Sequence, residues 1–108
     1  MSVFIVQEVY GRNFLPAKEY GELVPMLPYD MQIYLSTAPA ARKLTRFLQN
    51  FSDNDYILLV GDPVLIGLAT AIACMHNRGK AKLLKWDKRT MCYHPVEVDL
   101  IPKENDDA

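Results

Sequence analysis

The hydrophobic and polar positions between residues 56 and 86 follow the order of a β-α-β unit. An apolar run at residues 56–60 ends at Gly61-Asp62-Pro63, and a helical pattern continues to residue 77. A second apolar-rich run then occupies residues 81–86. Because a helix between two strands typically connects parallel strands of one sheet, the pattern predicts an α/β domain with some parallel pairing.

An earlier segment repeats this order of strand, polar corner, proline and helix. Residues 32–35 predict a short strand, and either Ser36 or Thr37 can cap the helix that follows. Pro39 then falls in the first turn, where the missing N–H breaks no helical hydrogen bond. Apolar residues between positions 44 and 51 recur at helical spacing, which indicates one buried face.

The second helix, predicted over residues 64–77, is apolar on nearly every face. Asp62 is a suitable N-cap and Pro63 a suitable first helical residue, while Arg78-Gly79 favours termination there. A helix that is apolar all round is buried between two layers or against a partner.

The remaining patterns complete a sheet. Strands are predicted at residues 3–9, at residues 22–27 with Pro25 confining the run to an edge or bulge, and at residues 91–100 with an interruption at Pro95. Residues 87–90 predict a turn, and residues 102–108 an acidic, disordered tail. We therefore predict a single α/β domain over residues 1–101, with a mixed, mostly parallel sheet of about five or six strands and two helices. Its parallel core consists of residues 32–35, 56–60 and 81–86.

Composition narrows the functional classes. Half of the 108 residues are hydrophobic and the formal net charge is −1, so a packed core is expected without a global attraction to nucleic acid or anionic membranes. No apolar run approaches the roughly 20 residues that span a bilayer, and the N-terminus lacks a signal-peptide pattern. Two cysteines make no disulfide framework. These features predict a cytoplasmic protein with reduced thiols and no membrane contact.

Two polar corners at strand ends are candidate ligand sites. Ser36 and Thr37 follow one predicted parallel strand, and Gly61 and Asp62 follow the next, so neighbouring strands would place a small anion or nucleotide between two helix N-termini. The alternative is that both corners are ordinary helix caps, which require these residue types in any case. The Asp62 carboxylate already occupies the helix end, and no nucleotide-binding glycine motif is present. No cofactor is expected.

Basic residues concentrate late in the chain and form a candidate nucleic-acid site. The set consists of Lys80, Lys82, Lys85, Lys88 and Arg89, with Trp86 as a stacking partner for bases. Strand alternation places Lys80 and Lys82 on one face and Lys85 on the other. The alternative is an edge hairpin whose lysines prevent aggregation between sheets.

Cysteine and histidine occur as two pairs, Cys74 with His76 and Cys92 with His94. Residues two apart diverge on a helix but share a face on a strand, so only the second pair can act together. The paired-cysteine spacings of zinc sites are missing, and nothing in the sequence marks either thiol as a nucleophile. We therefore predict neither a metal site nor a catalytic residue.

Three segments together, at residues 55–63, 83–87 and 93–100, resemble small proteins of tailed bacteriophages. The resemblance covers most of residues 3–100, and no activity is established for that group. It implies a protein made in the cytoplasm of an infected bacterium, and it carries over no functional residue.

We interpret the chain as a non-enzymatic accessory or regulatory module that binds a protein partner or itself. Contact would use the apolar helix at residues 64–77 or an open sheet edge, which makes a homodimer one expected form. The alternatives are nucleic-acid binding through residues 80–89 and a small-ligand site at the two polar corners.

Overall fold

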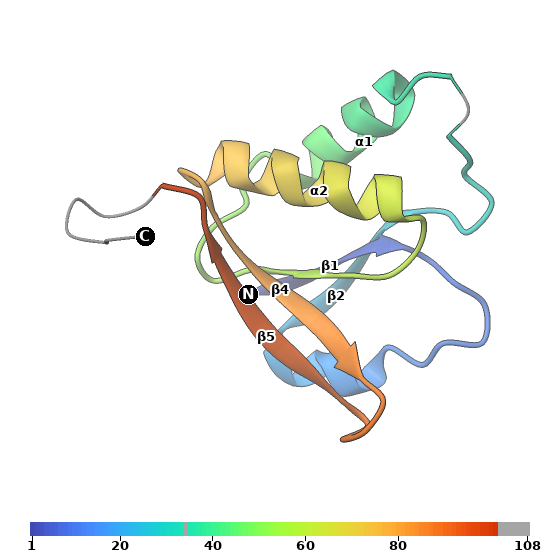
Figure 1. Cartoon of the computed structure of the whole chain (residues 1–108), viewed down its shortest axis with the longest axis vertical. Helices are drawn as coiled ribbons and strands as arrows, with labels where there is room; N and C mark the ends of the chain where they lie inside the picture. Colours follow the sequence, from blue (N-terminus) through green and yellow to red (C-terminus); the bar gives the residue numbers. More distant parts are fainter. Residues whose placement is uncertain (34, 102–108) are drawn as a thin grey trace.

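The computed structural model describes residues 1–33 and 35–101. This part of the chain contains a mixed sheet of five strands. The predicted tail at residues 102–108 lies outside that part. The strands are β1 (Ser2–Gln7), β2 (Glu22–Leu27), β3 (Tyr56–Leu58), β4 (Lys80–Asp87) and β5 (Cys92–Asp99), and the helices are η1 (Leu15–Tyr20), α1 (Ala38–Leu48) and α2 (Pro63–His76) (Figure 1). The predicted α/β class is confirmed, with a mixed sheet. The 3-10 helix η1 was not predicted.

The strand order is β2-β1-β3-β4-β5, with parallel pairing from β2 to β4 and antiparallel pairing of β4 with β5. The chain moves in one direction from β1 to β2 and in the opposite direction from β2 through β3 to β4. Right-handed crossovers therefore place η1 on one face of the sheet and both α-helices on the other. Figure 1 shows α1 and α2 together on one side of the strands, with η1 on the opposite side.

Two hydrophobic cores lie on the two faces of the sheet. The helix-side core includes Val6, Ile57 and Ala81 together with the buried faces of α1 and α2. The η1-side core includes Val3, Ile5, Leu58 and Leu84, with Ala17 of η1 fully buried against them. Since β1 and β3 are buried on both faces, their continuous apolar sequences are expected of central parallel strands.

The strand predicted at residues 32–35 is absent. Residues 31–33 and 35 are not in a strand, Tyr34 lies outside the described residues, and the Leu35 side chain is fully exposed. The parallel neighbour of β3 is instead β1, which pairs Val3 with Tyr56 and Ile5 with Leu58. A buried position between β2 and β3 requires apolar residues on both faces, and the apolar run at residues 3–6 of β1 supplies them, whereas residues 32–35 form a shorter run that begins with the polar Gln32.

Local signals at the helix termini were more reliable. Helix α2 begins as predicted, because the Asp62 carboxylate accepts a hydrogen bond from the Val64 N–H at 2.8 Å and Pro63 follows at the first helical position. At the start of α1, Thr37 occupies the N-cap position without a side-chain hydrogen bond, while the Ser36 hydroxyl accepts from the Ala38 N–H at 3.2 Å.

Both outer strands contain a proline near their middle. Pro25 lies in β2 and Pro95 in β5, at the two ends of the strand order. Pro25 was predicted to confine its strand to an edge, and β2 is an edge strand. Proline removes a backbone donor from the row that an edge presents to another chain, so both edges are poorly suited to adding a further strand.

Candidate functional site

The carboxyl ends of β1 and β3 meet where the chain reverses its direction across the sheet, which is where open α/β sheets tend to bind ligands. An open hollow of about 470 Å³ lies at this point. Its lining includes Gln7, Glu8, Tyr10, Tyr29, Gly61 and Asp62. The rings of Tyr10 and Tyr29 are 4.3 Å apart between centroids, so they pack on each other and leave no slot for a planar ligand between them.

The buried Gln7 side chain fills the inner part of this hollow. Its Nε2 donates to the carbonyl oxygens of Pro28 at 3.1 Å and Met31 at 3.0 Å, and its Oε1 accepts from the Asp62 N–H at 2.9 Å. A Cβ at Gly61 would lie 2.5 Å from the Gln7 Cβ. The protein therefore satisfies its own polar groups here, where a ligand site would leave some of them unpaired.

The predicted ligand site at Ser36, Thr37, Gly61 and Asp62 rested on two adjacent parallel strands. Only the second strand exists, so Gly61 and Asp62 have the end of β1 beside them in the sheet rather than Ser36 and Thr37. Gln7 was missed by sequence reasoning. The available signal was a single amide side chain at the end of an otherwise apolar strand, residues 3–7.

The structure also divides the basic residues of the predicted nucleic-acid site. Ala81 and Leu83 pack in the helix-side core and Leu84 in the η1-side core, so Lys80 and Lys82 project on the η1 side and Lys85 on the helix side. Strand alternation had predicted this division. Lys88 and Arg89 lie in the exposed turn after β4, and the Arg89 Nε is 3.8 Å from an Asp87 carboxylate oxygen.

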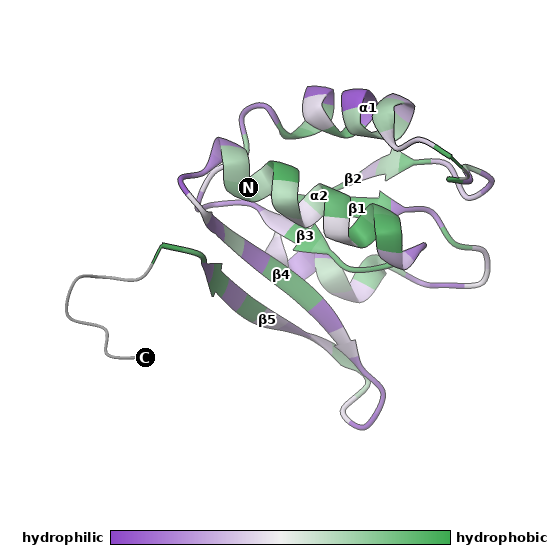
Figure 2. Cartoon of the chain, turned by 45° about the horizontal axis from the view of Figure 1, so that its top comes forward, coloured by the Kyte–Doolittle hydropathy of each residue, from purple (hydrophilic) through white to green (hydrophobic). Residues whose placement is uncertain are grey.

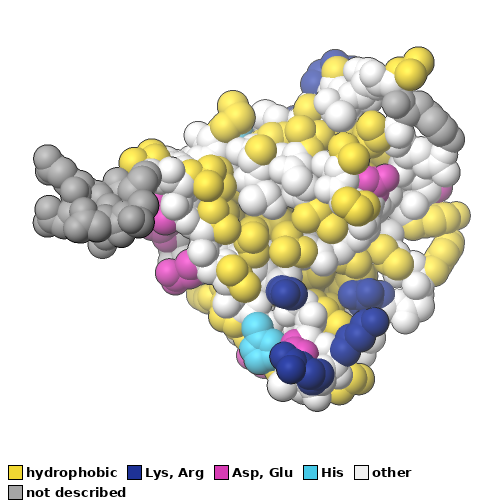
Figure 3. Space-filling model, viewed as in Figure 1, with side chains coloured by type: hydrophobic (Ala, Val, Ile, Leu, Met, Phe, Trp, Pro, Cys, Tyr) yellow, Lys and Arg dark blue, Asp and Glu magenta, His cyan; other side chains and the backbone are white. Residues whose placement is uncertain are grey.

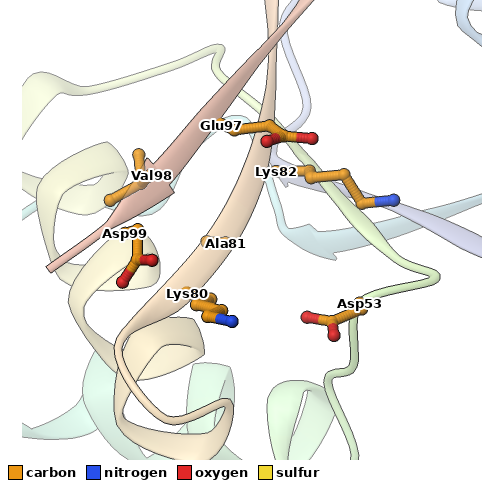
Figure 4. A pocket seen from close by; sticks show the side chains of 7 residues that line it. All are labelled: Asp53, Lys80, Ala81, Lys82, Glu97, Val98 and Asp99. Carbon is orange, nitrogen blue, oxygen red and sulfur yellow. The ribbon is translucent and has the colours of Figure 1, made fainter. Parts of the chain in front are cut away.

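Lys80 and Lys82 have acidic neighbours. They line a hollow of about 390 Å³ with Asp53, Glu97 and Asp99, and the Lys80 side chain points toward Asp53 (Figure 4). A hydrogen bond from the Asn77 amide at 2.9 Å lowers the pKa of Asp53, and the nearby Lys80 lowers it further. The ammonium of Lys82 lies 4.7 Å from the centre of the Tyr56 ring. These lysines are therefore partly compensated within the protein.

Trp86 is part of the η1-side core. Its ring packs edge-on against Tyr93 with centroids 4.9 Å apart, and the Tyr20 hydroxyl donates to the Tyr93 carbonyl at 3.1 Å. The Tyr93 hydroxyl is buried without a hydrogen-bond partner among the described residues, and burial raises the pKa of Tyr93. Trp86 is thus engaged in packing rather than free to stack on a base.

A polar cluster lies at the turn end of the β4–β5 hairpin. The His94 Nε2 contacts the Thr90 hydroxyl at 2.8 Å, the Cys92 sulfur at 3.5 Å and an Asp87 carboxylate oxygen at 3.5 Å. A Cys-His-Asp relay requires the acid and the nucleophile on different ring nitrogens, whereas here all three partners approach the same one. Within the described ranges, no group of three or more His, Cys, Asp or Glu side chains, this cluster included, has an arrangement that could hold a metal ion.

An exposed apolar surface extends over α2 and the hairpin. We call it the α2–β5 face, and its exposed members are Val64 and Met75 of α2, Val96 of β5, and Leu100 and Ile101 after β5. Figure 3 shows hydrophobic side chains gathered across this side of the molecule, with Lys, Arg and a histidine at its lower end. Ile101 packs beside Gly79, directly after α2, so the helical and strand parts of the face adjoin.

The physical origin of this face is a helical layer narrower than the sheet. Helix α2 packs on β4 and β1, and α1 packs on β2, while the hairpin extends past both helices (Figure 2). Val96 therefore stays 44% exposed although its strand partner Leu83 packs against the helix-side core. The sequence indicated the helix 64–77, but it did not indicate that β5 would be uncovered.

A family model described as Phage Pam3 gp32-like protein matches residues 1–100. The chain belongs to this phage family. The resemblance to small phage proteins is thereby confirmed. No curated protein and no solved structure matches the chain in the corresponding comparisons.

The gp32-like match covers every strand and helix described above, so the strand-end hollow, the basic hairpin and all of the α2–β5 face except Ile101 lie within the matched residues. Within the described residues, none of the helices has the length and apolar character needed to cross a bilayer.

Proposed function

We propose that this gp32-like protein is a non-enzymatic accessory module that acts by binding a protein through the α2–β5 face. The observation that carries the proposal is the environment of α2. Every residue from Val64 to Met75 is uncharged, yet the outer positions 64, 67, 71 and 75 are exposed. A helix that is apolar all round is normally buried on all sides, so this stripe is expected to meet a partner.

The other candidate sites are less well supported than the α2–β5 face. Gln7 fills the inner part of the strand-end hollow, and the basic residues of the hairpin are divided between two sheet faces and a turn. The His94 cluster lacks the geometry of a relay. Binding through an apolar face requires none of these groups.

Site-specific photo-cross-linking in bacterial cells tests the proposal. A benzophenone side chain would replace Met75, and the matched control would replace Leu15, an exposed apolar residue of η1. We expect a discrete covalent adduct from position 75 and none from position 15. The cross-linked partner would be identified by mass spectrometry and then purified by itself. It should bind the wild-type chain and not the Met75→Gln/Val96→Thr variant. Equal labelling from both positions, or none from either, would reject the α2–β5 face as a binding surface.

A further inference from the structure

Helix α1 carries positive charge that its own segment does not balance. The chain has 12 Lys and Arg and 13 Asp and Glu residues, and residues 31–52 contain three of the basic residues and none of the acidic ones. The three are Arg42, Lys43 and Arg46, all within α1. In a chain whose net charge is −1, positive charge is therefore concentrated on one helix.

The basic side chains lie on the solvent side of this helix. Its opposite side is formed by the buried residues Ala40, Leu44 and Leu48. At 3.6 residues per turn, Arg42, Arg46 and Gln49 follow one line on the outward side, and all three are exposed. The exposed Thr45 flanks this line on one side, and the half-buried Lys43 flanks it on the other. Figure 2 shows α1 at the outer edge of the molecule with strongly hydrophilic positions along it.

No acidic side chain compensates these cations. Within the described residues, none of the three takes part in an ion pair. The nearest acidic residues along the chain are Asp30 and Asp53, and Asp53 instead accepts a hydrogen bond from the Asn77 amide at 2.9 Å. Arg42 and Arg46 are also four residues apart, a spacing at which like charges on a helix repel each other. An anionic partner along α1 would relieve this repulsion.

The residue types on the outward side of α1 fit duplex nucleic acid better than other anionic partners. Helix α1 exposes no large apolar side chain, which a helix at a membrane surface or the centre of a protein interface requires. It also presents no exposed aromatic ring on which single-stranded bases could stack. Arg and Gln, by contrast, hydrogen-bond to phosphates and to base edges in the major groove of DNA, which admits one helix.

The position of α1 leaves its outward side accessible. The helix packs on β2 and on α2, whereas α2 packs on β1 and β4. Helix α2 therefore separates α1 from the hairpin, and the basic side of α1 is distinct from the α2–β5 face. Figure 3 shows basic side chains at the top of the molecule, where Figure 1 places α1, far from the basic group at the lower end.

We infer that α1 is a DNA-binding helix whose Arg42–Arg46–Gln49 line enters the major groove of duplex DNA. In this arrangement the two arginines and Gln49 contact base edges and adjacent phosphates, and Lys43 contacts the phosphate backbone at the side of the groove. The inference goes beyond the proposed function, because it assigns a second surface of the same domain. A chain with both surfaces would hold a protein partner on DNA.

Fluorescence anisotropy of the purified full chain with a labelled DNA duplex of about 20 base pairs, roughly two helical turns, tests the inference. At low salt we expect a dissociation constant in the micromolar range, and Arg42→Gln/Arg46→Gln should weaken binding by about tenfold or more. The matched control is Lys85→Gln/Lys88→Gln, which removes the same charge from the hairpin and should change the affinity by less than about twofold. Gln and Arg have similar helix propensities, so the α1 variant should stay folded, and thermal unfolding checks this.

Two further readouts distinguish a major-groove contact from a general attraction to anions. Three phosphate contacts predict a slope of log affinity against log salt of about −2.7, which Arg42→Gln/Arg46→Gln should reduce to about −0.9. Duplex RNA of the same sequence has a deep, narrow major groove that a helix does not enter, so it should bind about tenfold or more weakly than DNA. Vesicles that contain phosphatidylserine should not bind, since α1 has no exposed apolar side chain to insert.

Each contrary result overturns a stated part of the inference. If DNA does not bind at low salt, or if the two double variants lose affinity equally, α1 is not the DNA-binding element. If duplex RNA or the vesicles bind as tightly as DNA, the contact is not in the major groove. The cross-link from position 75 is independent of all these measurements, so the proposed function and this inference can fail separately.

Discussion

The Gln7 side chain accepts a hydrogen bond from the Asp62 N–H at 2.9 Å and so joins the end of β1 to the start of α2. The same amide donates to two carbonyl groups that follow β2, those of Pro28 and Met31. One buried side chain thereby links the end of β1, the segment after β2 and the start of α2 at the carboxyl edge of the sheet. These hydrogen bonds are shielded from water, so a substitution that leaves one of their donors or acceptors unpaired is costly.

Gly61→Ala should be strongly destabilising, because Gly61 has a φ of 111° and its added Cβ would lie 2.5 Å from the Gln7 Cβ. The conformational cost of about 1–2 kcal/mol adds to an overpacking cost of about 1–3 kcal/mol. We therefore expect the free energy of unfolding in urea to fall by roughly 2–5 kcal/mol. Gly11→Ala is the matched control, since its φ of 77° is also positive but its Cβ would meet nothing within 4 Å. Equal losses for the two variants would show that the contact with Gln7 is unimportant.

Asp53 should contribute a pH-dependent share of stability. Its pKa is lowered below the ordinary 3.8 chiefly by the hydrogen bond from the Asn77 side chain, so its ionised form is favoured by folding. A depressed carboxyl pKa stabilises the protein above the unfolded-state pKa, and this contribution is lost as pH falls through the folded-state value. Wild type should thus be more stable than Asp53→Ala at neutral pH, with a difference that shrinks below about pH 4. Urea unfolding of both proteins across the acid range measures it, and a difference independent of pH would assign the effect to packing alone.

The two thiols should react at very different rates. Cys74 is buried in the helix-side core and burial raises the pKa of its thiol, whereas Cys92 is partly exposed at the hairpin. Because the thiolate is the reactive form, a disulfide reagent should modify Cys92 quickly and Cys74 only when the protein opens. Stopped-flow labelling should show one fast phase, which Cys92→Ser removes and Cys74→Ser retains. A fast phase in Cys92→Ser would mean that α2 opens readily.

Any binding of single-stranded nucleic acid should depend only weakly on salt. On the helix side and turn only Lys85, Lys88 and Arg89 remain together from the predicted basic set, since Lys80 and Lys82 project from the other sheet face. Three phosphate contacts predict a slope of log affinity against log salt of about −2, compared with about −3.5 for all five cations. Fluorescence anisotropy with a labelled oligonucleotide over a salt series measures this slope. A slope near −3.5 would show that all five cations contact the nucleic acid together. Loss of binding in Lys85→Glu/Lys88→Glu would place the binding site at the turn end of the hairpin.

Features that depend on near neighbours along the chain could be predicted from the sequence. The strand at Glu22–Leu27 has the predicted bounds, Asp62 caps α2 and Pro25 marks an edge, because capping, proline geometry and side-chain alternation act over a few residues. The division of Lys80 and Lys82 from Lys85 followed from the same alternation.

Which strands are neighbours, and which apolar residues stay exposed, depends on contacts between distant segments and became visible only in the folded chain. Residues 32–35 resemble a strand locally, yet β1 occupies the place beside β3, since burial on both faces is a requirement of the whole sheet. The same reason explains Gln7, whose partners follow it in the chain by at least 21 residues. The sequence shows that Val96 is apolar but not that it is exposed. Its exposure arises because the helical layer ends before the hairpin does.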